Sequence, residues 1–313
     1  MLPQNRIPGY LCIHQHTHNP TQPIIGCVQL RILIRMALPC CPPGSLPSVS
    51  AAQAGATGPT TGEEFLLDAE TRAYVARPPN KSEMKGAVLV FHDIFGYDSA
   101  RTHHICDEIA SWGYLVISPD FFGKELAGIT DETDVFSIWA PWRLFTKGGT
   151  FLGRARIPFA PVEAKIRNLV MPWLEKECGP NVKIGTLGFC WGGWAITRAA
   201  SLPFFSCAVG AHPSPDLQYL QSEGPTTAQL YEQIKVPILY LPGSNDPYWL
   251  KENGSVWAAI KKTSPESKCV TFPDMIHGWV NRGDIRVPNV KRDYEKAMEE
   301  IKGFYEKHLQ SRL

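Results

Sequence analysis

The stretch IGTLGFCWGG at residues 184–193 decides the fold class. Its first half is an apolar run that predicts a buried strand, and the residues from Trp191 onward predict a helix. A strand-to-helix turn that is tight enough to expose one reactive side chain needs glycine two positions before and after that residue. Gly188 and Gly192 flank Cys190 at this spacing, so the stretch predicts a nucleophile elbow with Cys190 at its apex.

The sulfur of Cys190 would face the N-terminal end of the following helix, whose dipole favours the thiolate over the thiol. An ordinary cysteine thiol has a pKa of ~8.5, so only a small fraction would otherwise be ionised at neutral pH. A lone buried cysteine is more often a small apolar side chain that fills space. Here the strand, the paired glycines and the helix together favour a nucleophile.

Two later loops supply the residues that such a nucleophile requires. Asp246 lies in PGSNDP, directly after the apolar run VPILYL, and His277 lies in PDMIHG, after KCVTF. Taken separately, Asp246 could be a turn residue and His277 a surface histidine. The chain order of nucleophile, acid and histidine is that of α/β-hydrolases, so we expect His277 to handle the proton and Asp246 to orient its ring.

An acyl-transfer site also needs backbone N–H groups that bind the oxyanion. The residue after the nucleophile, Trp191, would supply one of them. The second is expected from HDIFG at residues 92–96, which follows the apolar run GAVLVF, and we assign it to the Ile94 amide. An ordinary strand-to-helix loop is the alternative interpretation of HDIFG.

From residue 63 onward, short apolar runs alternate with helical patterns, as is typical of a doubly wound, mostly parallel sheet flanked by helices. The expected strands lie at 65–77, 87–92, 114–118, 182–188, 206–211, 236–241 and 267–272. The expected helices lie at 99–112, 161–177, 191–202, 252–264 and 289–309. Residues 63–313 therefore predict one α/β domain, in which 123–158 could form a cap. Residues 1–62 are rich in Pro, Gly, Ser and Thr and predict a disordered extension.

Composition narrows the class of partner. A formal net charge of +1 without basic blocks argues against nucleic acid and anionic membranes. Nine irregularly spaced cysteines indicate a reducing compartment. The sequence has no long apolar run and no secretory signal, so we expect a cytoplasmic protein, either a monomer or a small homo-oligomer. The histidines in CIHQHTH at residues 12–18 could chelate a metal, but no closed second shell is expected there, and we predict no metal site.

The motifs HDIFG, PDFFG, GFCWGG, PGSNDP and HGW occur in that order, and with them residues 63–313 resemble the dienelactone hydrolase family, or carboxymethylenebutenolidases. The resemblance implies an α/β-hydrolase fold and a small-molecule ester or lactone substrate. It also implies that Cys190, Asp246 and His277 hydrolyse this substrate through a covalent acyl-cysteine. It implies no metal or organic cofactor.

Two further site residues, Asp93 and Arg282, follow from the resemblance, and a third, Trp249, follows from its place in the sequence. Asp93 stands where bacterial members carry a Glu that holds the resting thiol, so Asp93 is a candidate modulator of Cys190. Arg282 is a candidate for binding a substrate carboxylate, with a solvated surface charge as the alternative. Trp249 belongs to a group of aromatic residues near the motif loops and is expected to contact the substrate.

Two other functions remain open from the sequence. A thiol redox sensor would pair Cys190 with Cys207 or Cys178, although it would not explain Asp246 and His277. A non-catalytic binding module of the same fold would keep the pocket without the reaction.

Overall fold

The computed structural model describes residues 41–123, 126 and 142–309, and the side chains of residues 142–148 are not included. The histidine-rich stretch at residues 12–18 and most of the expected cap at 123–158 lie outside the described residues. What the structure describes of that cap region is mainly one helix, α4 (Trp142–Arg156).

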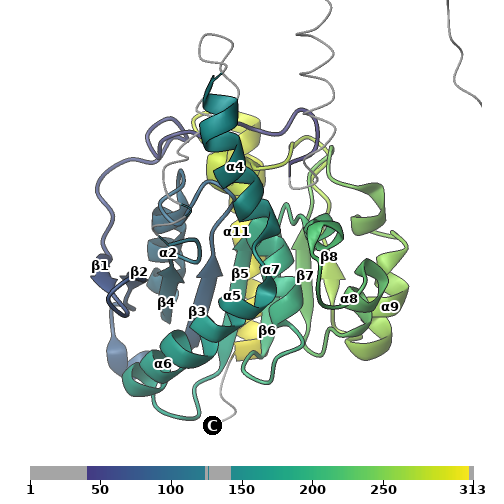
Figure 1. Cartoon of the computed structure of the whole chain (residues 1–313). Coiled ribbons are helices and arrows are strands. Elements are labelled where there is room, and N and C mark those ends of the chain that lie inside the picture. Colours follow the sequence, from purple (N-terminus) through teal and green to yellow (C-terminus); the bar gives the residue numbers. More distant parts are fainter. Residues whose placement is uncertain (1–40, 124–125, 127–141, 310–313) are drawn as a thin grey trace, which may run out of the picture. The chain divides into compact units, whose positions relative to one another are not determined.

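In the described part of the chain, eight strands form one sheet (Figure 1). Its order is β1-β2-β4-β3-β5-β6-β7-β8; β1 and β2 pair antiparallel, as do β2 and β4, and the other pairs are parallel. The strands are β1 (Glu63–Leu66), β2 (Arg72–Ala76), β3 (Gly86–Phe91), β4 (Tyr114–Pro119), β5 (Ile184–Phe189), β6 (Cys207–Ala211), β7 (Ile238–Leu241) and β8 (Lys268–Cys269). The predicted mostly parallel α/β-hydrolase sheet is confirmed.

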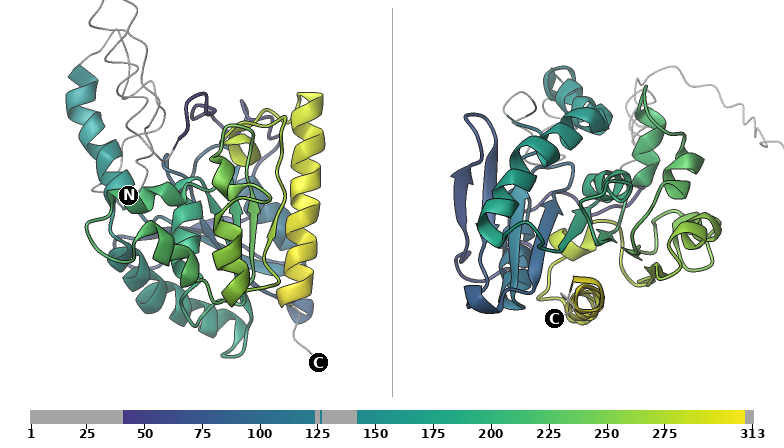
Figure 2. Two further views of the ribbon diagram at one scale, coloured as in Figure 1. Left: turned by 90° about the vertical axis from the view of Figure 1, so that its right-hand side faces the viewer. Right: turned by 90° about the horizontal axis from the view of Figure 1, so that it is seen from below.

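Helices cover both faces of this sheet (Figure 2). The α-helices besides α4 are α2 (Thr102–Ser111), α5 (Phe159–Lys165), α6 (Met171–Cys178), α7 (Trp191–Ala199), α8 (Thr227–Glu232), α9 (Val256–Thr263), α10 (Trp279–Arg282) and α11 (Pro288–Leu309). A π-helical turn at Ile166–Val170 joins α5 to α6, and 3₁₀ turns lie at Lys81–Glu83, Pro215–Leu220 and Tyr248–Leu250. None of the helices in the described residues combines the length and the apolar content that a bilayer span would need.

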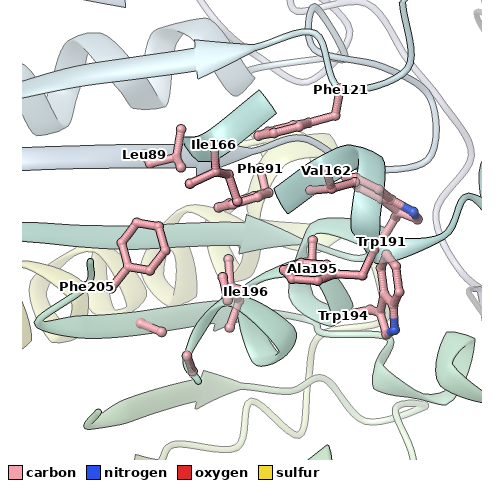
Figure 3. Close-up of a cluster of buried hydrophobic side chains, with 14 of the residues drawn as sticks. Leu89, Phe91, Phe121, Val162, Ile166, Trp191, Trp194, Ala195, Ile196 and Phe205 are labelled. Carbon is pink, nitrogen blue, oxygen red and sulfur yellow. The ribbon is translucent and has the colours of Figure 1, made fainter. Parts of the chain in front are cut away.

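The two faces of the sheet bury two separate cores because side chains alternate along each strand. On β3, Ala87, Leu89 and Phe91 point into the core under α5, α6 and α7, whereas Val88 and Val90 point toward α2 and α11. Figure 3 shows the first of these cores, in which Leu89 and Phe91 lie near side chains of α5 and α7. A strand that is buried on both faces has a continuous apolar sequence, and GAVLVF is such a run.

The strand expected at 65–77 is wrong in one respect, because the structure divides it into β1 and β2. Asp68 causes the division. Its Oδ1 accepts hydrogen bonds from the Glu70 and Thr71 amides, at 2.9 Å and 2.6 Å, and closes a turn that reverses the chain. β1 then pairs antiparallel with β2 at the edge of the sheet.

Residues 41–62 differ from the disordered extension expected there, since they pack against the domain. Ala54 has no exposed surface, and its carbonyl accepts a hydrogen bond from the buried guanidinium of Arg101. Nearer the site, the Leu46 amide donates to the carbonyl of His277 at 2.9 Å. These contacts join the segment to residues far away in the chain and bury only scattered side chains such as Ala54, so they leave no apolar periodicity that the sequence could display.

Candidate active site

Cys190 sits at the tight turn between β5 and α7, with φ 52° and ψ −108°. This turn leaves no room for side chains at either glycine. A Cβ at Gly188 would collide with the carbonyl of Gly192, and a Cβ at Gly192 would collide with the carbonyl of Phe91. The backbone therefore has the strained strand-to-helix geometry that the sequence predicted, and the Cys190 side chain is buried.

The structure brings Asp246 and His277 together from loops that follow β7 and β8. His277 Nδ1 lies 2.6 Å from Asp246 Oδ1, and neither side chain has exposed surface. The Gly243 amide donates to Asp246 Oδ2 at 2.7 Å, and the His277 amide donates to Asn245 Oδ1 at 2.6 Å. The first bond closes the loop after β7, and the second ties the loop after β8 to it, so that the carboxylate and the imidazole are held in a fixed orientation.

His277 also lies near the thiol, because a ring nitrogen of His277 and Cys190 Sγ are within 4.8 Å of each other. Nδ1 is engaged by Asp246, so Nε2 is the nitrogen that can serve the sulfur. Burial by itself would lower the pKa of His277, but the negative charges of Asp246 and Cys190 outweigh it and raise this pKa to about 9. The arrangement favours an imidazolium beside the sulfur at neutral pH.

The two amides assigned to the oxyanion lie at the ends of β3 and β5. Trp191 is the first residue of α7, where an amide has no partner within the helix. In the loop after β3, the Phe95 amide donates to Asp93 Oδ1, whereas the Ile94 amide donates to no atom of the described residues. The Ile94 carbonyl accepts from Arg154 Nη1 at 2.8 Å, which fixes the peptide.

The structure pairs Asp93 with Arg282. Arg282 Nε lies 3.6 Å from Asp93 Oδ2, and both side chains are fully buried, so a solvated surface charge is the wrong interpretation of Arg282. The same carboxylate accepts hydrogen bonds from Ser99 Oγ at 3.1 Å and Asn281 Nδ2 at 2.9 Å. The Asp93 oxygens are therefore occupied by groups other than the thiol.

Trp249 is half-buried, and its ring packs against Tyr231 with a centroid separation of 6.3 Å. The described residues give it no ring contact with Trp191 or His277. At the elbow itself, the Trp191 indole stacks on His92, with 5.4 Å between the ring centroids.

Sequence reasoning missed His212, which follows β6 and lies with its ring centroid 5.0 Å from that of His277. Burial lowers the pKa of His212 well below its ordinary value, and the positive charges of His277 and Arg282 lower it further. His212 is consequently neutral beside the His277 imidazolium. The sequence could have identified His212, because this residue stands at the carboxyl end of a strand, where α/β-hydrolases place functional groups.

Cys41 is a second residue that the sequence did not identify, and its Sγ lies 3.8 Å from Cys190 Sγ. The cysteines considered as redox partners lie elsewhere. Cys207 pairs in the sheet with Gly185, five residues before Cys190, which corresponds to about 16 Å along a strand. Cys178 ends α6, and its thiol contacts Met84 Sδ at 3.7 Å. No sequence pattern connects Cys41 to the elbow, since 149 residues separate the two cysteines.

A family model described as the dienelactone hydrolase family matches residues 71–309. A carboxymethylenebutenolidase homolog of Rattus norvegicus is 36% identical over 233 residues, 71% of this chain and 80% of that protein. One of Xenopus tropicalis is 34% identical over 150 residues, 48% of this chain and 53% of that protein. Among solved structures, esterase 2 of Thermogutta terrifontis aligns with a TM-score of 0.53 at 14% identity, covering 81% of this chain and 97% of that one.

Proposed function

The chain belongs to the dienelactone hydrolase family of carboxylic ester hydrolases, and from this premise we propose that Cys190 is its nucleophile and forms an acyl-cysteine. The observation that carries the proposal is the Asp246–His277 hydrogen bond of 2.6 Å, formed beside a cysteine held at positive φ. Asp246 fixes the tautomer and stabilises the imidazolium. His277 is then both the counter-ion of the thiolate and the proton donor.

In the acylation step, the Cys190 thiolate attacks the carbonyl carbon of the ester or lactone. The oxygen gains negative charge, and we assign its binding to the Ile94 and Trp191 amides. The carbon–oxygen bond then breaks, and the alkoxide leaves with the proton from His277 Nε2. A lactone would release its alcohol as part of the same acyl chain.

Deacylation requires His277 to act as a base. Once Cys190 is esterified, its negative charge no longer raises the pKa of His277, so the ring stays neutral more readily. Neutral Nε2 accepts a proton from water, the hydroxide adds to the thioester, and the thiolate departs. The acid is released, and the thiolate and imidazolium are restored.

Arg282 and Asp93 suggest an anionic substrate. Arg282 is a buried cation whose ring contact with Phe95, at 5.0 Å, and ion pair with Asp93 hold it in place. A substrate carboxylate would compete with Asp93 for this guanidinium, which is how Asp93 could influence the site without touching the sulfur. Trp249 would then contact the part of the substrate farther from the reacting bond.

The proposed mechanism and the charge of the chain also bear on its cellular compartment, partners and oligomeric state. A thiolate nucleophile is preserved in a reducing compartment such as the cytoplasm. With a formal net charge of +1, we expect no nucleic acid or membrane partner, and a monomer or small homo-oligomer suffices because the catalytic residues come from one chain.

The test measures the hydrolysis rate and looks for the covalent acyl-enzyme. An activated aryl ester and a dienelactone are offered to the wild type, Cys190→Ala and His277→Ala, and the acylated protein is sought by intact mass after rapid acid quenching. We expect Cys190→Ala to lose at least about 10³-fold in kcat and to show no adduct. Hydrolysis undiminished in Cys190→Ala would end the proposal. Ligand binding by a wild type that never turns over would favour a non-catalytic binding module.

A further inference from the structure

Three potential metal ligands converge at the elbow. Cys41 Sγ, Cys190 Sγ and one ring nitrogen of His277 all lie within 4.8 Å of one another, although they come from three separate segments of the chain. We propose that Cys41, Cys190 and His277 form a site for a thiophilic divalent cation such as Zn²⁺, and that the bound ion switches the hydrolase off. The binding site stands on these side chains alone, whereas the inhibition rests on the function proposed above.

The separation of the two sulfurs fits tetrahedral zinc. With Zn–S bonds of about 2.3 Å and tetrahedral angles, two thiolate ligands stand about 3.8 Å apart. Cys41 Sγ and Cys190 Sγ are 3.8 Å apart. The two cysteines therefore need no large movement to share an ion, whereas a disulfide would require the sulfurs to approach to about 2.05 Å.

His277 is prepared as the third ligand. Asp246 engages Nδ1 at 2.6 Å and leaves Nε2 as the coordinating nitrogen. A histidine ligand that donates its other N–H to a carboxylate is the usual arrangement at protein zinc sites, because the carboxylate fixes the ring and raises its basicity. The Gly243 amide in turn holds Asp246 at 2.7 Å. The same hydrogen bonds that suit His277 to proton transfer thus suit it to a metal.

Charge and access are also compatible with an ion here. Two thiolates neutralise the charge of Zn²⁺, so the complex adds no net charge to a buried position. The Cys41 thiol and Nε2 of a protonated His277 lose their protons on coordination, and Cys190 binds as the thiolate. Cys190 and His277 have no exposed surface, but Cys41 is half-buried and gives the ion a route from solvent. Water can complete the four-coordinate shell.

A metal ion bound at this site would block both reacting groups, the Cys190 sulfur and His277 Nε2, at once. The sulfur lone pair that attacks the carbonyl would be bound to the metal, and Nε2 could no longer carry a proton. Removing the ion with a chelator would restore both groups, so the inhibition would be reversible. The catalytic steps proposed above give no role to Cys41, which is what allows the site to be tested separately from catalysis.

The experiment compares the wild type, Cys41→Ser and Cys41→Ala with the control Cys178→Ser, all as the reduced full chain handled without oxygen. Cys178 is a suitable control because it is also half-buried but ends α6. Zinc affinity is measured by competition with a chromophoric chelator, and Co²⁺ is used as a spectroscopic probe. We expect the wild type and Cys178→Ser to bind one Zn²⁺ and to show the intense thiolate-to-cobalt band of a tetrahedral site.

Both Cys41 variants should weaken zinc binding by at least about 100-fold, because even changes outside the ligand shell cost about 10- to 100-fold. Their cobalt band should fall to about half, because one of two thiolates remains. Added Zn²⁺ should stop ester hydrolysis by the wild type and by Cys178→Ser, while the Cys41 variants stay active at the same concentration.

The possible outcomes test the metal site and the catalytic mechanism separately. Unchanged zinc affinity in the Cys41 variants, or a wild type that binds no zinc, would overturn the metal site even if the enzyme is active. Zinc binding that depends on Cys41 in a protein without hydrolase activity would support the site and count against the catalytic mechanism.

Discussion

The backbone of Cys190 is held in a conformation that a residue with a side chain rarely adopts. Its φ of 52° costs on the order of 1–3 kcal/mol and persists only where the surroundings enforce it. The enforcing contacts are hydrogen bonds to Cys190 itself. Its carbonyl accepts from the amides of Gly193 at 2.8 Å and Ser214 at 3.1 Å, and its amide donates to the Ala211 carbonyl at 3.3 Å. The sulfur is consequently positioned before any substrate arrives.

The raised pKa of His277 predicts how acylation depends on pH. A pKa of about 9 means that the ring keeps its proton through neutral pH and loses it as the pH rises through about 9. Because the proposed mechanism gives this proton to the leaving alcohol, the acylation rate should fall on the alkaline side with an apparent pKa near 9. Single-turnover kinetics with an alkyl ester, a poor leaving group, would measure this limb.

Asp246→Asn serves as the comparison for that profile. It removes the largest influence that raises the pKa of His277, so the alkaline limb should move to lower pH, and the rate should fall by about 10³- to 10⁴-fold. An alkaline limb at the same pH in both proteins would mean that His277 is not the titrating donor.

At the elbow between β5 and α7, the start of α7 lies too close to the end of β3 to leave room for a side chain at Gly192. Gly192→Ala places a Cβ against the carbonyl oxygen of Phe91, which is backbone and cannot rotate away. We expect it to lower the free energy of unfolding by more than about 3 kcal/mol. Gly303→Ala on α11 is the matched control, because a Cβ there meets nothing within 4 Å and should stabilise the helix by about 1 kcal/mol.

Thermal unfolding followed by circular dichroism would compare the two glycine variants with the wild type. The midpoint should fall for Gly192→Ala and rise for Gly303→Ala. Equal midpoints for the wild type and Gly192→Ala would show that the turn can open, and the close approach of β3 and α7 would then lose its role in positioning the sulfur.

For individual helices and strands, regular spacing of apolar residues was the most reliable basis for predicting their bounds. The helix expected at 289–309 is α11, because its apolar residues recur at helical spacing and meet one core. The strand expected at 267–272 reduces to β8 at Lys268–Cys269, followed by a single bridge between Gly243 and Phe272. Strand ends at a sheet edge depend on neighbouring strands rather than on their own composition, so the sequence could not give them.

At the scale of the whole molecule, the site is built from segments that lie far apart in the chain. Only some of their contacts could be predicted from the sequence. The positions of Cys190, Asp246 and His277 were predictable, because each follows a recognisable strand and parallel strands end at one edge of the sheet. The pairing of Asp93 with Arg282 and the approach of Cys41 to Cys190 were not, because each depends on tertiary packing between distant segments. Buried ion pairs and contacts between distant thiols leave no periodic trace in a sequence.

The segment at residues 41–56 gives the last prediction, which concerns the stability of the domain as a whole. The Ala54 carbonyl accepts from the buried Arg101 guanidinium and also from the Ile285 amide, at 3.1 Å for the latter. A chain that begins at residue 57 would leave the buried Arg101 cation short of an acceptor, whereas a chain that begins at residue 41 keeps it. Since an unsatisfied buried partner costs about 1–3 kcal/mol, and more when it is charged, the shorter chain should unfold at lower temperature and lower urea concentration. Identical denaturant midpoints for the two chains would mean that residues 41–56 contribute nothing to the fold, and the approach of Cys41 to the Cys190 sulfur would then lack a structural basis.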